Sequence, residues 1–97
     1  MTAEAMLTTL KITLMISPSN TAYDDYLIEK LDAAKAYIIR EGAATLSPEA
    51  SVEDADLVIG YAAFLHRQKS EADAKLPRWL RWAINNRIMS EKAGGVS

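Results

Sequence analysis

Cysteine is absent from the 97 residues of the chain, and histidine occurs once, as His66. Disulfide bonds, thiolate metal sites and cysteine nucleophiles are therefore excluded. A single histidine leaves one candidate base for a serine triad and no second ligand for a histidine metal cluster. No apolar run approaches the ~20 residues that span a bilayer, and no secretory signal is visible. The sequence thus predicts a protein of a reducing, cytoplasmic setting, outside any membrane.

Glycine and proline are scarce, with four and three copies, and the sequence contains no glycine-rich phosphate loop or dinucleotide-binding fingerprint. Zinc-ligand spacings and a GxSxG nucleophile motif are absent as well. His66 has Ser70 nearby, but nothing orients the pair, so a surface or aromatic-packed histidine is favoured. Acidic clusters at 24–25 and 53–56 stand at predicted helix starts, where carboxylates complement the helix dipole. We therefore expect no enzyme activity, catalytic residue, cofactor, metal ion or small-molecule substrate.

The residues that are present have ordinary globular proportions, with 49% hydrophobic and 25% charged side chains. No repeat or linker divides the chain, which predicts one domain over residues 1–97. Charge is distributed unevenly, because residues 1–65 carry four basic and ten acidic side chains whereas residues 66–97 carry seven basic and three acidic. Such polarity suits head-to-tail pairing of copies or contact between the basic end and a polyanion, beside the simpler interpretation of two solvated faces.

Helical periodicity is clearest between residues 21 and 40. The apolar positions of this segment recur at the spacing of one helix face: Leu27, Leu31, Ala34 and Ile38. Thr21 stands three residues before Asp24, as in a capping box, and Gly42 is a suitable C-terminal stop. The segment is predicted to be an amphipathic helix.

A third element is predicted over residues 52–68, with Ser51 as its candidate N-cap. Residues 57–65 are apolar throughout, and a helix that is apolar on all sides is buried on all sides. In a chain this small, such a helix is either the central helix of the bundle or is completed by a neighbouring subunit.

The fourth element opens at Leu76–Pro77 and places Trp79 in register with an apolar stripe, which predicts Trp79 to be a core residue. Trp and Arg are concentrated here, and these two residue types are common in binding hot spots and in nucleic-acid contacts. We therefore select five candidate residues for contacts with a partner or another subunit: Arg78, Arg81, Trp82, Asn85 and Arg87.

The first element is ambiguous, because residues 9–16 alternate as a strand does while Leu7, Leu10 and Leu14 fit helical spacing. No other segment offers a strand partner, and a lone strand is unstable. We therefore expect an all-α fold, a small bundle of about four helices with a mostly buried third helix. Residues 1–5 and 93–97 are expected to fray at the ends.

Five stretches of the chain resemble tailed-phage head–tail connector proteins, small helical adaptors also described as DNA-packaging proteins. The first-half stretches are Leu10–Ser17 (LKITLMIS), Asp24–Ile28 (DDYLI) and Ala33–Ile38 (AAKAYI). In the second half, Asp56–Ile59 (DLVI) leads into the apolar helix, and Leu76–Arg87 (LPRWLRWAINNR) is similar to the closing helix of the family. The resemblance covers roughly residues 6–92.

This resemblance implies an all-helical structural protein of a bacteriophage or prophage. Such adaptors form ring oligomers below the portal protein, complete the head after DNA packaging and dock the tail. The implied partners are copies of the chain, the portal protein and tail-side connector proteins, close to packaged DNA. The implied locations are the virion head–tail junction and, during assembly, the host cytoplasm. The alternative function is a small helical DNA-binding or regulatory protein that uses the Arg/Trp-rich C-terminal helix.

Overall fold

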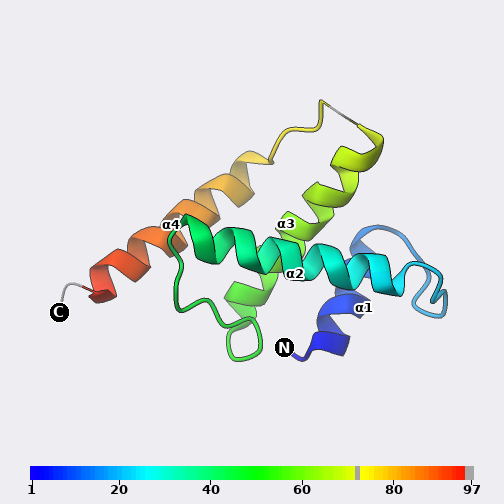
Figure 1. Cartoon of the computed structure of the whole chain (residues 1–97), viewed down its shortest axis with the longest axis horizontal. Helices are drawn as coiled ribbons and strands as arrows, with labels where there is room; N and C mark the ends of the chain where they lie inside the picture. The colour runs from blue at the N-terminus through cyan, green and yellow to red at the C-terminus, as the bar shows by residue number, and fades with distance from the viewer. Residues whose placement is uncertain (72, 96–97) are drawn as a thin grey trace.

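The computed structural model describes residues 1–71 and 73–95, and this part of the chain forms four α-helices and no strand (Figure 1). The helices are α1 (Ala3–Thr13), α2 (Asp24–Glu41), α3 (Val52–Ser70) and α4 (Arg78–Gly95). The predicted all-α bundle is therefore confirmed, including the choice of a helix for the first element. That helix ends at Thr13, so the last part of the alternating segment 9–16 lies in the following turn.

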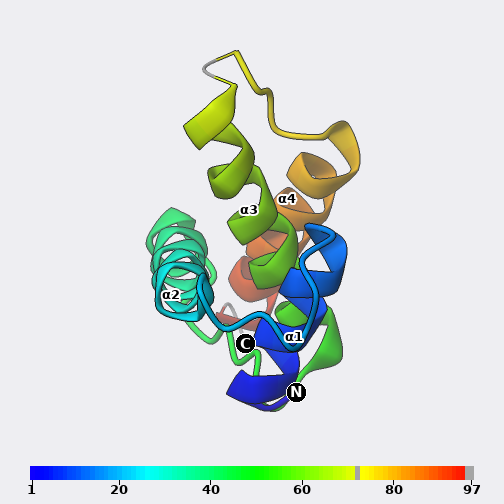
Figure 2. The same ribbon diagram turned by 90° about the vertical axis from the view of Figure 1, so that its right-hand side faces the viewer.

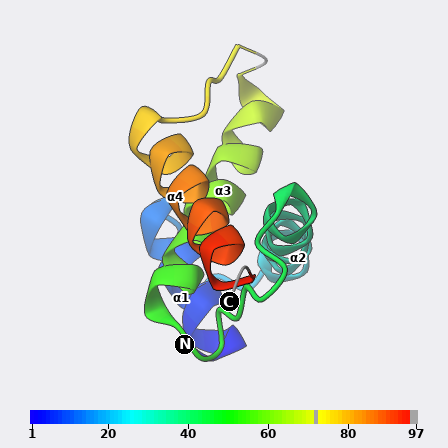
Figure 3. The ribbon, with the colours of Figure 1, turned by 90° about the vertical axis from the view of Figure 1, so that its left-hand side faces the viewer.

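Helix α3 is the centre of the bundle and packs against each of the other three helices. Figures 2 and 3 show α2 on one side of α3, with α1 and α4 on the other side. The molecule measures 46 × 31 × 18 Å, so it is long and flat rather than spherical. Among the helices of the described residues, none is both long and apolar enough to cross a membrane.

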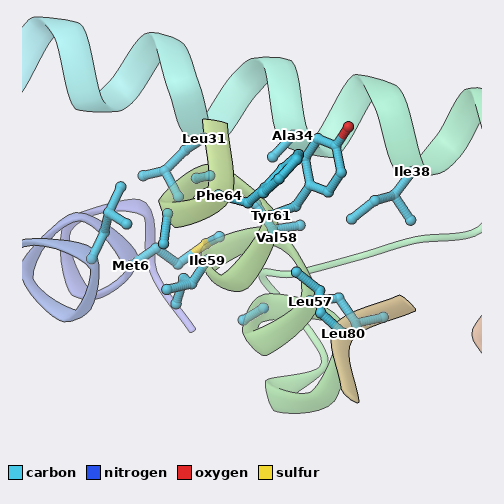
Figure 4. Packing of buried hydrophobic residues seen from close by; sticks show 14 of the residues in the cluster. Met6, Leu31, Ala34, Ile38, Leu57, Val58, Ile59, Tyr61, Phe64 and Leu80 are labelled. Carbon is cyan, nitrogen blue, oxygen red and sulfur yellow. The ribbon is translucent and has the colours of Figure 1, made fainter. Parts of the chain in front are cut away.

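The hydrophobic core is built around the apolar segment of α3 (Figure 4). Every residue of the predicted stripe on α2 is buried: Leu27, Leu31, Ala34 and Ile38. Leu10 of α1 and Leu80 of α4 are fully buried in the same core. Most of the segment 57–65 is thus buried by its own chain, and α3 is the central helix of the bundle.

The helix ends follow ordinary capping chemistry. The Ser51 side chain accepts a hydrogen bond from the Asp54 amide at 3.2 Å, as predicted. Gly42 ends α2 with a φ of 140°, in the region that favours glycine. The capping box predicted at Thr21 is wrong, because α2 begins at Asp24 after Tyr23 and has no side-chain cap.

The first residues of the chain belong to a capped helix. The Thr2 hydroxyl accepts a hydrogen bond from the Ala5 amide at 3.1 Å, and α1 begins directly after this cap, while the fraying expected for residues 1–5 stays a prediction. At the other end α4 continues to Gly95, so residues 93–95 are helical, while residues 96–97 lie outside the described part.

Lys11 is the least expected member of the interior, since it is only 3% exposed. Its ammonium donates to a carboxylate oxygen of Asp24 at 2.7 Å and to the backbone carbonyl of Pro18 at 3.0 Å. A buried charge needs such partners to offset its lost hydration. This ion pair joins the end of α1 to the start of α2 and uses one carboxylate of the first acidic cluster.

Candidate interaction surface on α4

Helix α4 buries only part of the stripe predicted for it. Leu80 and Ile84 are buried, but Trp79 is 59% exposed and Trp82 is 68% exposed. The prediction that Trp79 belongs to the core is therefore wrong. The reason lies in Gly60 of α3, where an added Cβ would stand 3.1 Å from the Leu80 side chain and 3.2 Å from the outer edge of the Trp79 ring. Leu80 fills the site beside this glycine, and only the edge of the indole reaches over it.

An open groove of about 610 Å³ runs between the start of α3 and the exposed side of α4. We call it the α3–α4 groove. From the α3 side it is lined by Ser51, Glu53, Asp54, Asp56 and Leu57, and from the α4 side by Trp79, Trp82, Ala83, Asn86, Arg87 and Ser90. One wall therefore carries carboxylates and the other carries both tryptophans of the chain.

The floor of the α3–α4 groove is held by an ion pair between Asp54 and Arg87. Arg87 Nε donates to Asp54 Oδ1 at 2.8 Å, and the Ser47 amide donates to Asp54 Oδ2 at 3.0 Å. Burial opposes ionisation of Asp54, but the hydrogen bonds from Arg87 and Ser47, with the guanidinium charge, hold its pKa below the ordinary value. The hydrogen bond to Asp54 in turn raises the pKa of Arg87.

Glu91 extends this network to the loop that precedes α3. The Thr45 hydroxyl donates to Glu91 at 2.8 Å, and the Thr45 amide donates to its other carboxylate oxygen. These hydrogen bonds, the one from the hydroxyl foremost, lower the pKa of Glu91. The network fastens α4 to both the loop and α3, so it is structural.

Four of the five predicted contact residues are exposed: Arg78, Arg81, Trp82 and Asn85. The fifth, Arg87, is partly buried, pairs with Asp54 and lines the α3–α4 groove. Trp82 lines the groove, whereas Arg78, Arg81 and Asn85 do not. At 3.6 residues per turn, Arg81 and Asn85 project from a different side of α4, and Arg78 stands one turn before Trp82, at the edge of the groove. The predicted cluster therefore divides into an indole wall and an adjoining basic surface.

Sequence reasoning missed the acidic wall, which is formed by Glu53 and Asp56. Both side chains are exposed and form no hydrogen bond or ion pair within the described residues. Their only local signal was a position at a helix start, which the helix dipole explains equally well. The antiparallel contact of α3 with α4 is what places them opposite the tryptophans.

The other candidates from the sequence have structural roles. The Tyr26 hydroxyl and His66 Nδ1 lie 3.2 Å apart, and the two rings meet edge to face, so His66 packs against an aromatic side chain as favoured. No group of three potential metal ligands occurs in the described part of the chain. Comparisons with protein-family models, with curated proteins and with solved structures find no match.

Proposed function

We propose that the chain is a structural adaptor of a phage or prophage head–tail junction, forming a ring below the portal protein, completing the packaged head and docking the tail. The observation that carries this proposal is the exposed indole wall of α4. Two tryptophans that are more than half exposed are uncommon on a surface with no partner, and Trp is a frequent anchor of protein interfaces.

The architecture supports a role in assembly rather than in turnover. The groove is open, its buried acid is neutralised by Arg87, and its remaining carboxylates are exposed to solvent. A catalytic site needs a positioned acid or base and protection from water. An adaptor needs only a stable helical bundle with an exposed surface that binds other proteins. On this proposal the protein resides at the virion vertex, and in the host cytoplasm while the virion is assembled.

DNA binding is the second candidate function, and Arg78 and Arg81 favour it, because both are exposed and neither forms an ion pair within the described residues. Against it, the guanidinium of Arg87 is already neutralised, and Glu53 and Asp56 would repel phosphate from the tryptophan wall. Base stacking on Trp79 or Trp82 would bring the DNA backbone close to these carboxylates. The acidic wall is compatible with the proposed adaptor function and opposes DNA binding at the tryptophans.

The test is electron microscopy of the protein mixed with the portal ring from the same phage or prophage. We expect an added ring of density on the portal, and loss of that ring in the double variant Trp79→Ala/Trp82→Ala. A variant with the exposed α2 residue Glu29 changed to Ala is the control. No added density with the wild-type protein would contradict the adaptor function.

Duplex DNA titrated at two salt concentrations tests the second function. Affinity that falls steeply with salt, and that is lost in Arg78→Ala/Arg81→Ala, would favour DNA binding over the adaptor role.

A further inference from the structure

Three basic residues form a second unpartnered surface on the same molecule. Lys75, Arg78 and Arg81 follow one another at intervals of three residues, at the end of the last loop and in the first turn of α4. All three are exposed and have no ion pair within the described residues. We call them the basic stripe. No acidic residue occupies the first turn of α4 to compensate them.

The basic stripe and the α3–α4 groove are complementary. Glu53 and Asp56 supply unpaired carboxylates on one wall, and an arginine guanidinium binds a carboxylate through two parallel hydrogen bonds. Trp79 and Trp82 supply exposed indole faces on the other wall, over which a guanidinium packs favourably. A groove with acids on one side and indoles on the other therefore suits an arginine side chain in both its charge and its flat apolar faces.

The two surfaces do not join within one molecule. Arg81 lies on a different side of α4 from the groove, and Arg78 stands at the groove edge, one turn before Trp82. Neither arginine forms an ion pair with Glu53 or Asp56 within the described residues. A contact between stripe and groove requires a second copy of the chain. Each copy then offers one groove and one stripe, so the contact is head-to-tail and continues from copy to copy until it closes as a ring or remains an open chain.

We propose that the α3–α4 groove is the docking site for the basic stripe of a second copy, with Arg78 and Arg81 entering between Glu53/Asp56 and Trp79/Trp82. The inference rests on the proposed adaptor function only for its biological purpose, since it names the surfaces that join neighbouring subunits. The contact itself is a property of the purified chain. It joins two unlike patches, and each interface uses both tryptophans of the copy that supplies the groove.

Charge exchange tests the contact directly. The groove variant Glu53→Lys/Asp56→Lys and the stripe variant Arg78→Glu/Arg81→Glu should each be monomeric by sedimentation velocity at concentrations where the wild type self-associates. Their equimolar mixture should associate again, because each variant now complements the other. Association of the wild type should weaken as salt is raised. Self-association of either variant to the wild-type extent, or a mixture that stays monomeric, would overturn the proposal.

Cross-linking gives a second readout that detects a weak contact and does not depend on charge-reversed variants. The chain has no cysteine, so Glu53→Cys and Arg81→Cys provide single reactive thiols on the two surfaces. A short bismaleimide reagent should join these two variants at least about tenfold more than it joins Arg81→Cys to Glu29→Cys, since docking raises the effective concentration of the paired thiols. Glu29 is an exposed acid on α2 and is the matched control. Equal yields for the two pairs would refute the contact.

The two proposals fail in different ways. If the purified chain shows no stripe-to-groove contact but adds density to the portal, the docking proposal is wrong and the adaptor function stands. If the copies join as described but no density is added to the portal, the contact between copies is real and the adaptor function is wrong.

Discussion

Asp54 and Arg87 are 33 positions apart in the sequence, yet the guanidinium of one lies 2.8 Å from the carboxylate of the other. The side chain of Asp54 is 7% exposed and that of Arg87 is 20% exposed, so the pair is largely removed from water. It joins the first turn of α3 to the second half of α4. Removing one member of such a pair leaves the other buried and uncompensated, which costs more than the intact pair contributes.

The substitution Asp54→Ala is accordingly expected to lower the free energy of unfolding by about 3 kcal/mol. It removes the acceptor of the Ser47 amide and the closest charge partner of Arg87, which keeps the Glu91 carboxylate at 3.9 Å and the Thr45 hydroxyl at 3.2 Å. Chemical denaturation measures the change. Asp56→Ala, an exposed carboxylate two residues away on the same helix, is the matched control and should shift stability by no more than about 0.5 kcal/mol. Equal losses in the two variants would show that the ion pair is not the cause.

Stability should fall in mild acid because of the same carboxylate. The native pKa of Asp54 lies below the ordinary value of 3.8, so the unfolded chain takes up this proton first as the pH falls. The contribution of Asp54 is therefore complete above about pH 5 and is lost as the pH falls through 3.8 towards the native pKa. Denaturation measured from pH 6 to pH 3, as an approximate range, should show a shallower decline for Asp54→Asn than for the wild type.

Substitutions along α4 should separate its buried and exposed sides. Leu80 is fully buried, and Leu80→Ala should cost about 2–5 kcal/mol. Trp82→Ala removes a larger side chain but should change stability by less than about 0.5 kcal/mol, because little of the ring is packed. Trp79→Ala should resemble the Trp82 variant much more than the Leu80 variant. Thermal melting of the three variants measures these changes. A large loss of stability for Trp79→Ala would show that Trp79 is a core residue after all.

The two glycines at helix contacts should respond to alanine to different degrees. Gly42 has a φ of 140°, and an added Cβ would stand 2.9 Å from the Ile88 side chain, so Gly42→Ala should cost about 1–3 kcal/mol. Gly60 lies inside α3, where alanine gains about 1 kcal/mol of helix propensity. This gain offsets the close contacts with Leu80 and the edge of Trp79, so Gly60→Ala should be nearly neutral. Urea denaturation of the two variants side by side provides the comparison.

The buried face of a helix could be predicted from the sequence wherever its apolar residues recur at regular helical spacing. The stripe on α2 and the unbroken apolar segment of α3 are local patterns, and each has a single compatible helix face. The prediction that Trp79 is a core residue was wrong because Trp79 stands at the border of its apolar stripe. At that position the size of Gly60, on another helix, decides how far the Trp79 side chain is buried. Local periodicity contains no information about that neighbour.

Only part of the interaction surface could be predicted from the sequence, because the rest depends on contacts between different helices. Arg78, Arg81 and Trp82 were found because Arg and Trp are unusual together on one helix. Arg87 has the same chemistry, but its partner Asp54 lies in a different helix, and no local pattern reports such a pairing. Glu53 and Asp56 form the opposing wall only because the packing of α3 against α4 places them across the groove from the tryptophans.

The thin attachment of α4 also has a dynamic consequence. Leu80 and Ile84 are its only fully packed apolar side chains among the described residues, whereas α1, α2 and α3 share most of the core. These two side chains and the polar contacts of Arg87 and Glu91 are a smaller attachment than the core that joins the other three helices, so α4 opens at a lower free energy than the body of the protein. Deuterium exchange should therefore reach the amides of α4 before those of α3, and the outermost helix would behave as an arm that can swing away while the remaining three keep their shape.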